Sequence, residues 1–248
     1  MSRYDFRTPR LYVQAQLGAG REVMLDRDQA NYLFNVLRLA DNDSVLLFNG
    51  QEGEWRSHVV KTGKRGALAV DECLRPQPGA SDLHVVFAPL KHVRFDYLVQ
   101  KMVEMGASRL QPAITQHTQV ARVNLARMRA NVIEAAQQCG ILTLAEVAEP
   151  APFGDLLQSL APDRLLVFCD EDAEVQDPVA ALRQAADFAG IAVLLGPEGG
   201  FSEAERQMLL RRPKVLRISL GPRILRADTA AVAALAIVQA VLGDWRGS

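Results

Sequence analysis

The chain has 248 residues, of which 49% are hydrophobic and 23% are charged, an ordinary composition for a globular protein. This composition excludes a disordered, collagen-like or coiled-coil protein, and the length predicts one or two domains with a full hydrophobic core. The net charge is −1, but residues 1–130 carry 18 basic and 13 acidic side chains, whereas residues 131–248 carry 10 and 16. The first half is therefore the part that an anionic partner would prefer.

Cysteine, histidine and hydropathy patterns indicate a cytoplasmic protein without a metal centre. Cys73, Cys139 and Cys169 are widely spaced and form no CxxC pair, which favours a reducing compartment over a disulfide framework. The four histidines show no HExxH motif or other metal-ligand pairing. The first ten residues lack the apolar core of a signal peptide. The most apolar stretch, 229–242, is too short to cross a bilayer and contains Gln239, so we expect no membrane segment.

Short strands and one helix are predicted in the first 74 residues. Residues 28–38 carry apolar side chains at helical spacing, with Asp28 as the expected N-cap. The predicted strands are 11–13, 22–25, 44–48, 54–60 and 67–72. Several short strands at this spacing indicate a small barrel or sandwich. Residues 75–81, which include two prolines and a glycine, are the expected linker.

From residue 82 onward, continuous apolar strands alternate with helices. The predicted strands are 83–89, 110–114, 165–168, 191–195 and 215–219. The predicted helices are 94–105, 124–139, 178–186, 202–210 and 229–242. Ser202 and Glu205 have the spacing of a capping box. The alternation predicts a parallel sheet that is covered by helices on both faces.

Three of these strands end in unusual loops, at the edge where parallel sheets bind ligands. One strand ends in CDED, residues 169–172. The next ends in GPEGG, residues 196–200, whose glycines let backbone approach a ligand but whose spacing matches neither a P-loop nor a dinucleotide-binding motif. The third ends in LGPRILRAD, residues 220–228, where apolar residues either close the end of the sheet or form a wall for a flat apolar group. Neither of the last two loops alone decides between structure and ligand binding.

Together the last two loops resemble the RsmE family of SPOUT-class RNA methyltransferases, which methylate N3 of a uridine in small-subunit ribosomal RNA. The segments that carry the resemblance are LLGPEGGFSEAE and ISLGPRILRADTAAVAAL, preceded in the expected order by YLFNVLRL, FDYLVQKMVEMGASRLQP and EAAQQCG. The resemblance spans nearly the whole chain. The sequence departs from the family at Asp228, where glutamate is usual, and in TQHTQV, residues 115–120, where many members carry an arginine.

The resemblance implies an α/β protein with a SPOUT trefoil-knot domain on a parallel sheet at 82–248. It further implies a PUA-like RNA-binding β-barrel at 1–74, with the linker at 75–81. The implied cofactor is S-adenosylmethionine, the substrate is 16S ribosomal RNA, free or in the 30S subunit, and the enzyme is a cytoplasmic homodimer. The implied cofactor-binding residues belong to two of the loops and the strand ends before them: Leu195, Gly196, Gly199, Ile218, Leu220, Gly221 and Leu225.

Methylation of uridine N3 requires removal of its proton, after which negative charge spreads onto the flanking carbonyl oxygens. A fixed guanidinium beside the base would stabilise this charge, and Arg226 and Arg223 are the catalytic candidates. Their structural alternative is an ion pair with Glu198 or Asp228. Glu198 is itself a candidate base, with a structural role as its alternative. Basic side chains that either contact RNA or merely cover the surface are Arg7, Arg10, Arg38, Lys91 and Arg94.

Two other functions remain open at this point. One is a SPOUT methyltransferase that acts on a ribose 2′-hydroxyl or on another base. The other is a catalytically silent RNA-binding protein that keeps the fold. The sequence contains no nucleophile constellation, so nothing indicates a covalent intermediate.

Overall fold

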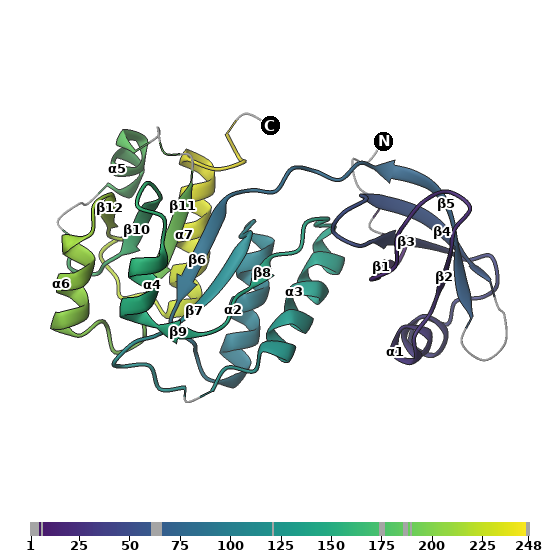
Figure 1. Cartoon of the computed structure of the whole chain (residues 1–248), viewed down its shortest axis with the longest axis horizontal. Coiled ribbons are helices and arrows are strands. Elements are labelled where there is room, and N and C mark those ends of the chain that lie inside the picture. Colours follow the sequence, from purple (N-terminus) through teal and green to yellow (C-terminus); the bar gives the residue numbers. More distant parts are fainter. Residues whose placement is uncertain are drawn as a thin grey trace. The chain divides into compact units, whose positions relative to one another are not determined.

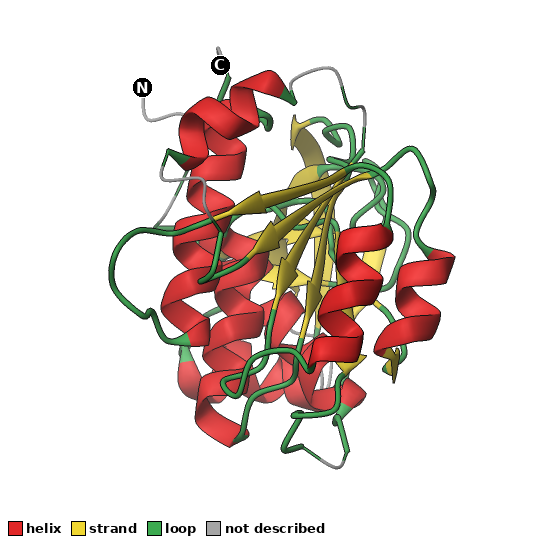
Figure 2. Cartoon of the chain, turned by 90° about the vertical axis from the view of Figure 1, so that its left-hand side faces the viewer, coloured by secondary structure: helices red, strands yellow, loops and turns green. Residues whose placement is uncertain are grey.

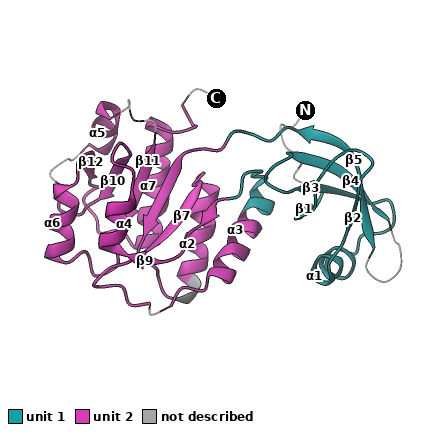
Figure 3. Ribbon diagram, in the orientation of Figure 1, with its two compact units in different colours: residues 1–79, 136–144 teal, residues 80–135, 145–248 magenta. Residues whose placement is uncertain are grey.

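The computed structural model describes residues 5, 7–60, 66–120, 122–173, 177–185, 188 and 190–246. The chain divides into two compact units (Figure 3). Unit 1 comprises residues 1–79 and 136–144, and unit 2 comprises residues 80–135 and 145–248. The sequence predicts contiguous domains on either side of a linker, whereas unit 1 also takes a segment from the middle of the chain.

Unit 1 is built on a five-stranded sheet in the order β1-β3-β4-β5-β2. Its strands are β1 (Arg10–Tyr12), β2 (Glu22–Met24), β3 (Ser44–Phe48), β4 (Glu54–Val60) and β5 (Ala67–Arg75). β1 and β3 are parallel, and the other neighbours are antiparallel. The strands form where the sequence predicts them, except that β5 continues to Arg75, which the sequence assigns to the linker.

The helix predicted at 28–38 is replaced by two short helical segments. α1 (Arg27–Asn31) begins after Asp26, whose carboxylate accepts a hydrogen bond from the amide of Gln29. The N-cap prediction of Asp28 is therefore wrong by two residues. A π-helix, η1 (Tyr32–Val36), follows α1 directly. It ends before Arg38, whose φ of 58° lies in the left-handed region.

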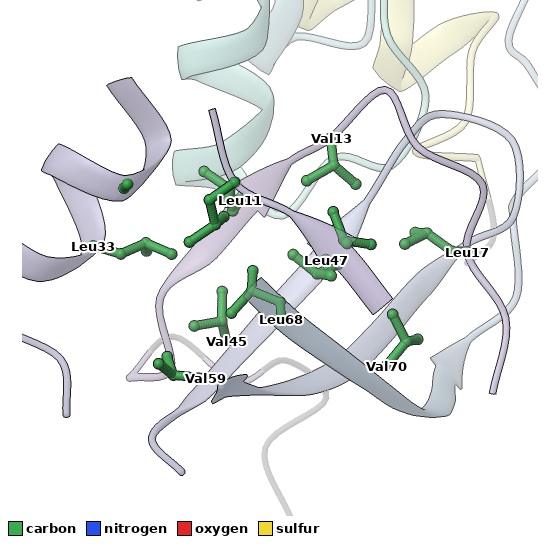
Figure 4. Packing of buried hydrophobic residues seen from close by; sticks show 12 residues of the cluster. Leu11, Val13, Leu17, Leu33, Val45, Leu47, Val59, Leu68 and Val70 are labelled. Atoms are coloured by element: carbon green, nitrogen blue, oxygen red, sulfur yellow. The ribbon is translucent and has the colours of Figure 1, made fainter. Parts of the chain in front are cut away.

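Branched aliphatic side chains form the core of unit 1 (Figure 4). Val45, Leu47, Val59 and Leu68 from the sheet are fully buried and pack with Leu33 of η1. The helical segment is thus held by its apolar side chains rather than by regular α-helical hydrogen bonding. Packing of this kind dominates helix stability in proteins.

Residues 136–144 belong to unit 1 because they complete a second small core there. Phe48 of β3 packs with Ala136 and Leu142 and is fully buried. The amide of Tyr12 in β1 donates a hydrogen bond of 2.8 Å to the side-chain oxygen of Gln137. This segment therefore covers apolar surface of the N-terminal sheet and accepts a hydrogen bond from one of its backbone amides.

Unit 2 contains a sheet in the order β12-β10-β11-β6-β7-β8, with β9 paired to β7 and every pair parallel. Its strands are β6 (Leu83–Phe87), β7 (Arg109–Ile114), β8 (Glu146–Val147), β9 (Ala151–Pro152), β10 (Leu165–Cys169), β11 (Ile191–Leu195) and β12 (Val215–Ile218). Each predicted strand forms. The sequence does not predict β8 and β9, because two-residue strands leave no periodicity in a sequence.

Helices cover both faces of this sheet, as predicted, and Figures 1 and 2 show them around the fanned strands. They are α2 (His92–Glu104), α3 (Leu125–Cys139), α4 (Phe153–Ser159), α5 (Pro178–Gln184), α6 (Glu203–Arg211) and α7 (Ala227–Val241). On one face, Phe153 of α4 and Leu209 of α6 pack with Leu194 of β11. α7 contacts β11 and also packs on α2 and α5. None of the helices in the described ranges combines the length and apolar character needed to cross a membrane.

Candidate active site

A cavity of about 1170 Å³ lies at the carboxyl ends of β10, β11 and β12. Its walls are the loops that follow these strands, 169–173, 195–201 and 219–227, together with Arg94 of α2 and Ala230 of α7. This is the edge of a parallel sheet at which ligands bind. The structure thus brings the three unusual loops of the sequence to one site.

Nearly all the predicted cofactor-binding residues line this cavity. Six of them do so: Leu195, Gly196, Gly199, Leu220, Gly221 and Leu225. Ile218 does not, because it is fully buried at the end of β12, where its carbonyl accepts a hydrogen bond from the amide of Asp170. Gly221 has a φ of +105° and Gly200 a φ of +68°, conformations that glycine adopts without steric cost.

The GPEGG loop turns back onto the core through Phe201. Its ring lies 5.0 Å from the ring of Phe153 and 5.4 Å from that of Phe168. A Cβ atom at Gly196 would come within 2.8 Å of the Phe201 ring, so the glycine is needed for this close approach. α6 starts immediately afterwards, and Ser202 and Glu205 form the predicted capping box.

The apolar residues of the second loop do not all close the end of the sheet. Ile224 is 97% exposed, so the structural interpretation is wrong for this residue. Leu220 and Leu225 are half-buried and line the cavity. The loop therefore presents apolar side chains both to the cavity and to solvent.

Arg223 and Arg226 line the cavity with exposed side chains. Within the described ranges neither has an ion-pair partner, so the predicted alternative pairing with Glu198 or Asp228 does not occur there. Glu198 instead pairs with Arg94, with Nη1 and Oε1 2.9 Å apart. Both guanidinium groups of the loop are thus free to meet a ligand in the cavity.

Asp170, in the CDED loop, ties this loop to α6 and β12. Its side chain is fully buried and accepts two hydrogen bonds of 2.9 Å from Arg206 of α6 and one of 2.6 Å from Arg217 of β12. Burial favours the neutral acid, but the hydrogen bonds from the two arginines outweigh it and lower the pKa of Asp170. The carboxylate is therefore a fixed structural anion, a role that the sequence pattern does not reveal.

Cys169 also borders the cavity, but burial raises the pKa of its thiol to about 12. A thiol with this pKa provides no thiolate nucleophile at neutral pH. Among the residues that the structure describes, no three His, Cys, Asp or Glu side chains are arranged to hold a metal ion.

The five predicted RNA contacts fall in different places. Arg7 and Arg38 are exposed in unit 1, and Lys91 is exposed at the start of α2, close in sequence to Arg94 of the cavity wall. The prediction that Arg10 contacts RNA is wrong, because the residue is only 7% exposed and its guanidinium forms an ion pair with Glu54.

The pair formed by Arg10 and Glu54 is part of a buried cluster in unit 1. Arg10 Nε lies 2.5 Å and Arg75 Nε 2.7 Å from the Glu54 carboxylate. Burial favours the neutral form of Glu54, but the hydrogen bonds from the two arginines outweigh it and lower its pKa. Arg10 therefore compensates a buried carboxylate, and its burial keeps the guanidinium away from RNA phosphate.

His117 and Gln116 contact the GPEGG loop and α6, although the sequence pattern does not mark them as site residues. His117 Nδ1 lies 3.1 Å from the carbonyl oxygen of Gly199 and 3.0 Å from that of Gly200. The amide of Gln116 donates a hydrogen bond of 2.8 Å to Glu205. The sequence marks this segment only by its departure from the pattern of the family that the chain resembles.

Comparison with known proteins agrees with this arrangement. Residues 77–239 match the RNA methyltransferase domain family, and residues 25–72 match the RNA methyltransferase PUA domain. The fold and the site therefore define an RNA methyltransferase of the SPOUT type with an N-terminal PUA domain.

Individual relatives narrow this class. The chain is 29% identical to ribosomal RNA small subunit methyltransferase E of Rickettsia conorii, over 93% of this chain and 94% of the relative. It is 30% identical to the Synechocystis protein of the same name, over 89% and 73%. The crystal structure of the Neisseria gonorrhoeae protein bound to S-adenosyl methionine matches with a TM-score of 0.86 and 27% identity, over 96% and 100% of the two chains. The chain belongs to the ribosomal RNA small subunit methyltransferase E (RsmE) family.

Proposed function

We propose that this protein transfers a methyl group from S-adenosylmethionine to N3 of a uridine in 16S ribosomal RNA. The observation that carries the proposal is that the GPEGG and LGPRILRAD loops line one cavity with two arginines that have no ion-pair partner in the part of the chain that the structure describes. Relatives named as small-subunit ribosomal RNA methyltransferases align over most of the chain. The trefoil knot implied by the resemblance would be formed by these same loops.

The cavity fits the proposed cofactor. Its volume of about 1170 Å³ is ample for a ligand of this size. The backbone at Gly196, Gly199 and Gly221 would approach the ligand, while Leu195, Leu220 and Leu225 would pack on its apolar parts. The structures of the Neisseria gonorrhoeae and Legionella pneumophila relatives both contain S-adenosylmethionine, and the latter matches with a TM-score of 0.80 at 27% identity. When bound, this cofactor supplies an electrophilic methyl group on its sulfonium.

The acceptor base requires help with its proton and with the resulting charge. Arg226 and Arg223 would stabilise the anion that spreads over the uridine carbonyl oxygens, because both line the cavity and neither is ion-paired with a carboxylate of the described residues. Glu198 is the proposed acceptor of the N3 proton. Asp170 is unsuited to that role, because its carboxylate is buried between two arginines.

RNA would contact both units. Lys91 and Arg94 lie at the start of α2 and would hold RNA beside the cavity, while Arg7 and Arg38 are exposed cations of unit 1. Arg10 is buried and is not among these contacts. A ribosomal RNA substrate also implies a cytoplasmic enzyme.

We further propose a homodimer that uses the alanine-rich α7. Ala233 and Ala236 are half-buried in the single chain and would allow close approach of a second subunit. Sedimentation at micromolar concentration should show twice the chain mass of 27.2 kDa. A single species of chain mass would contradict the dimer.

A primer-extension assay tests the methylation site. N3 carries the Watson–Crick proton of uridine, so a methyl group there blocks base pairing. Reverse transcriptase should stop one nucleotide before a uridine of 16S RNA or of 30S subunits after incubation with protein and S-adenosylmethionine. Readthrough with the methyl group recovered on ribose would favour the 2′-O-methyltransferase alternative. Absence of cofactor binding in calorimetry would favour a silent RNA-binding protein.

A further inference from the structure

His117 joins two loops that are far apart in the sequence. It lies in the segment between β7 and α3, and its Nδ1 atom is within hydrogen-bond distance of the carbonyl oxygens of Gly199 and Gly200 in the GPEGG loop. Both partners are carbonyl oxygens, which only accept hydrogen bonds. Nδ1 must therefore carry the proton and donate to both.

The segment that carries His117 is itself well anchored. The amide of Gln116 donates to Oε1 of Glu205, while Oε2 of the same carboxylate accepts from the amide of Ser202. The amide of Thr115 donates to the hydroxyl of Thr118, which closes the turn around His117. The imidazole therefore projects from a fixed support that is fastened to the first turn of α6.

The two glycines are the part of the cofactor loop that most needs such support. Glycine loses more conformational freedom on ordering than any other residue, and Gly200 has a left-handed φ of +68°. A loop that must be ordered when a ligand binds reduces the affinity for that ligand. A donor that fixes both carbonyl groups in advance removes part of this cost.

We propose that His117 is a positioning residue that holds the Gly199–Gly200 backbone in the conformation that binds S-adenosylmethionine. This inference rests on the proposed function for its ligand, but the hydrogen-bond geometry does not depend on it. The residue acts through the loop and takes no part in methyl transfer. Its contribution should therefore be found in cofactor affinity and in the KM for the cofactor, with kcat at saturating cofactor unchanged.

Two substitutions separate the donor from the bulk of the ring. His117→Ala removes the donor, and we expect S-adenosylmethionine to bind about fivefold more weakly in calorimetry, the effect of losing one ordinary hydrogen-bond contribution. His117→Asn places an amide nitrogen near the position of Nδ1, so it should bind within about twofold of the wild type by the same reasoning. His58→Ala is the matched control, since His58 is a partly exposed histidine in β4 of unit 1 and should leave cofactor affinity unchanged.

Affinity of His117→Ala equal to the wild type, or failure of His117→Asn to recover the loss, would overturn the proposal. Nitrogen-15 spectra of the imidazole in the ligand-free protein provide a second test that needs no cofactor. The Nδ1-protonated tautomer is expected for His117, identified by its loss in His117→Ala, and the neutral Nε2-protonated tautomer would overturn the proposal. Wild-type protein that binds no S-adenosylmethionine would instead contradict the proposed function, while the tautomer would still decide the role of His117 in the loop.

Discussion

Nη1 of Arg94, in the first turn of α2, lies 2.9 Å from Oε1 of Glu198 in the loop after β11. Both side chains are about half exposed, so an ion pair of this kind contributes little to stability. Its position is more informative than its energy. The carboxylate proposed to take the uridine proton is held by a cation proposed to meet RNA, so an RNA phosphate that attracts Arg94 would release Glu198.

Glu198→Gln should slow methyl transfer by about 100-fold if the carboxylate accepts the proton, because general base catalysis is typically of this size. Single-turnover rates at saturating cofactor measure the effect, and calorimetry should show unchanged cofactor affinity. Glu171 also lines the cavity and provides the matched control, since Glu171→Gln should retain most of the rate. Full activity of Glu198→Gln would restrict Glu198 to holding Arg94.

Arg226→Ala should lower the chemical rate by about 100-fold or more, because it removes a donor from the charge that develops on the base. Cofactor affinity should change little. Arg226→Lys should recover only part of the rate, since an ammonium group does not reproduce the planar guanidinium. A rate that rises with pH until the uridine loses its proton would support deprotonation as the limiting step. If the alanine variant loses cofactor affinity and rate in parallel, Arg226 acts in binding instead.

Gly196 and Gly199 should respond differently to alanine. The new Cβ at Gly196 would press on the Phe201 ring, which is confined by Phe153 and Phe168, and such overpacking costs about 1–3 kcal/mol. We expect Gly196→Ala to lower both the unfolding temperature and cofactor affinity. At Gly199 the nearest atom to a new Cβ is 3.4 Å away, and the backbone there is not left-handed. Gly199→Ala should therefore lower the unfolding temperature less than Gly196→Ala. Equal effects of the two substitutions in thermal unfolding and calorimetry would argue against this packing of the loop.

Arg10→Ala should destabilise unit 1 by about 3 kcal/mol, because it leaves the buried Glu54 carboxylate with one fewer partner. Urea unfolding measures the loss, and Arg38→Ala, an exposed change in the same unit, should cost less than about 0.5 kcal/mol. The pKa of Glu54 is lowered in the folded state, so its stabilisation is present above the usual glutamate range and disappears as pH falls through the lowered value. The wild type should therefore lose stability in acid more steeply than Arg10→Ala.

Arg38→Ala should weaken RNA binding and reduce its dependence on salt. Each phosphate contact releases counterions, so loss of one contact should lower the slope of log affinity against log salt by about 0.7 for single-stranded RNA. Filter binding with 16S RNA at several salt concentrations measures the slope, and cofactor affinity should stay constant. A slope identical to the wild type would remove Arg38 from the interface.

Local patterns in the sequence account for much of the fold. Alternating or continuous apolar runs locate β3, β4 and β11 to the residue, and the spacing of Ser202 and Glu205 locates the start of α6. The two glycine-containing loops are recognisable because their residue types are unusual after a strand.

Local sequence patterns do not predict contacts between side chains that are distant in the sequence. The pairing of Arg10 with Glu54 decides that a predicted RNA contact is buried, and nothing near either residue signals it. The same holds for Asp170 with Arg206, and for His117 with the GPEGG loop. The π-helix is not predicted for a different reason. Over so few residues, the spacing of its apolar side chains cannot be distinguished from that of an α-helix.

The participation of residues 136–144 in unit 1 has a consequence for biosynthesis. During translation the first 79 residues emerge long before Ala136 and Leu142, so Phe48 lacks these apolar partners and the amide of Tyr12 lacks Gln137 for that period. The N-terminal sheet reaches its full set of contacts only when the chain has been made through α3 and beyond. A fragment that stops at residue 79 would remain in that immature condition permanently, with an apolar surface open to aggregation.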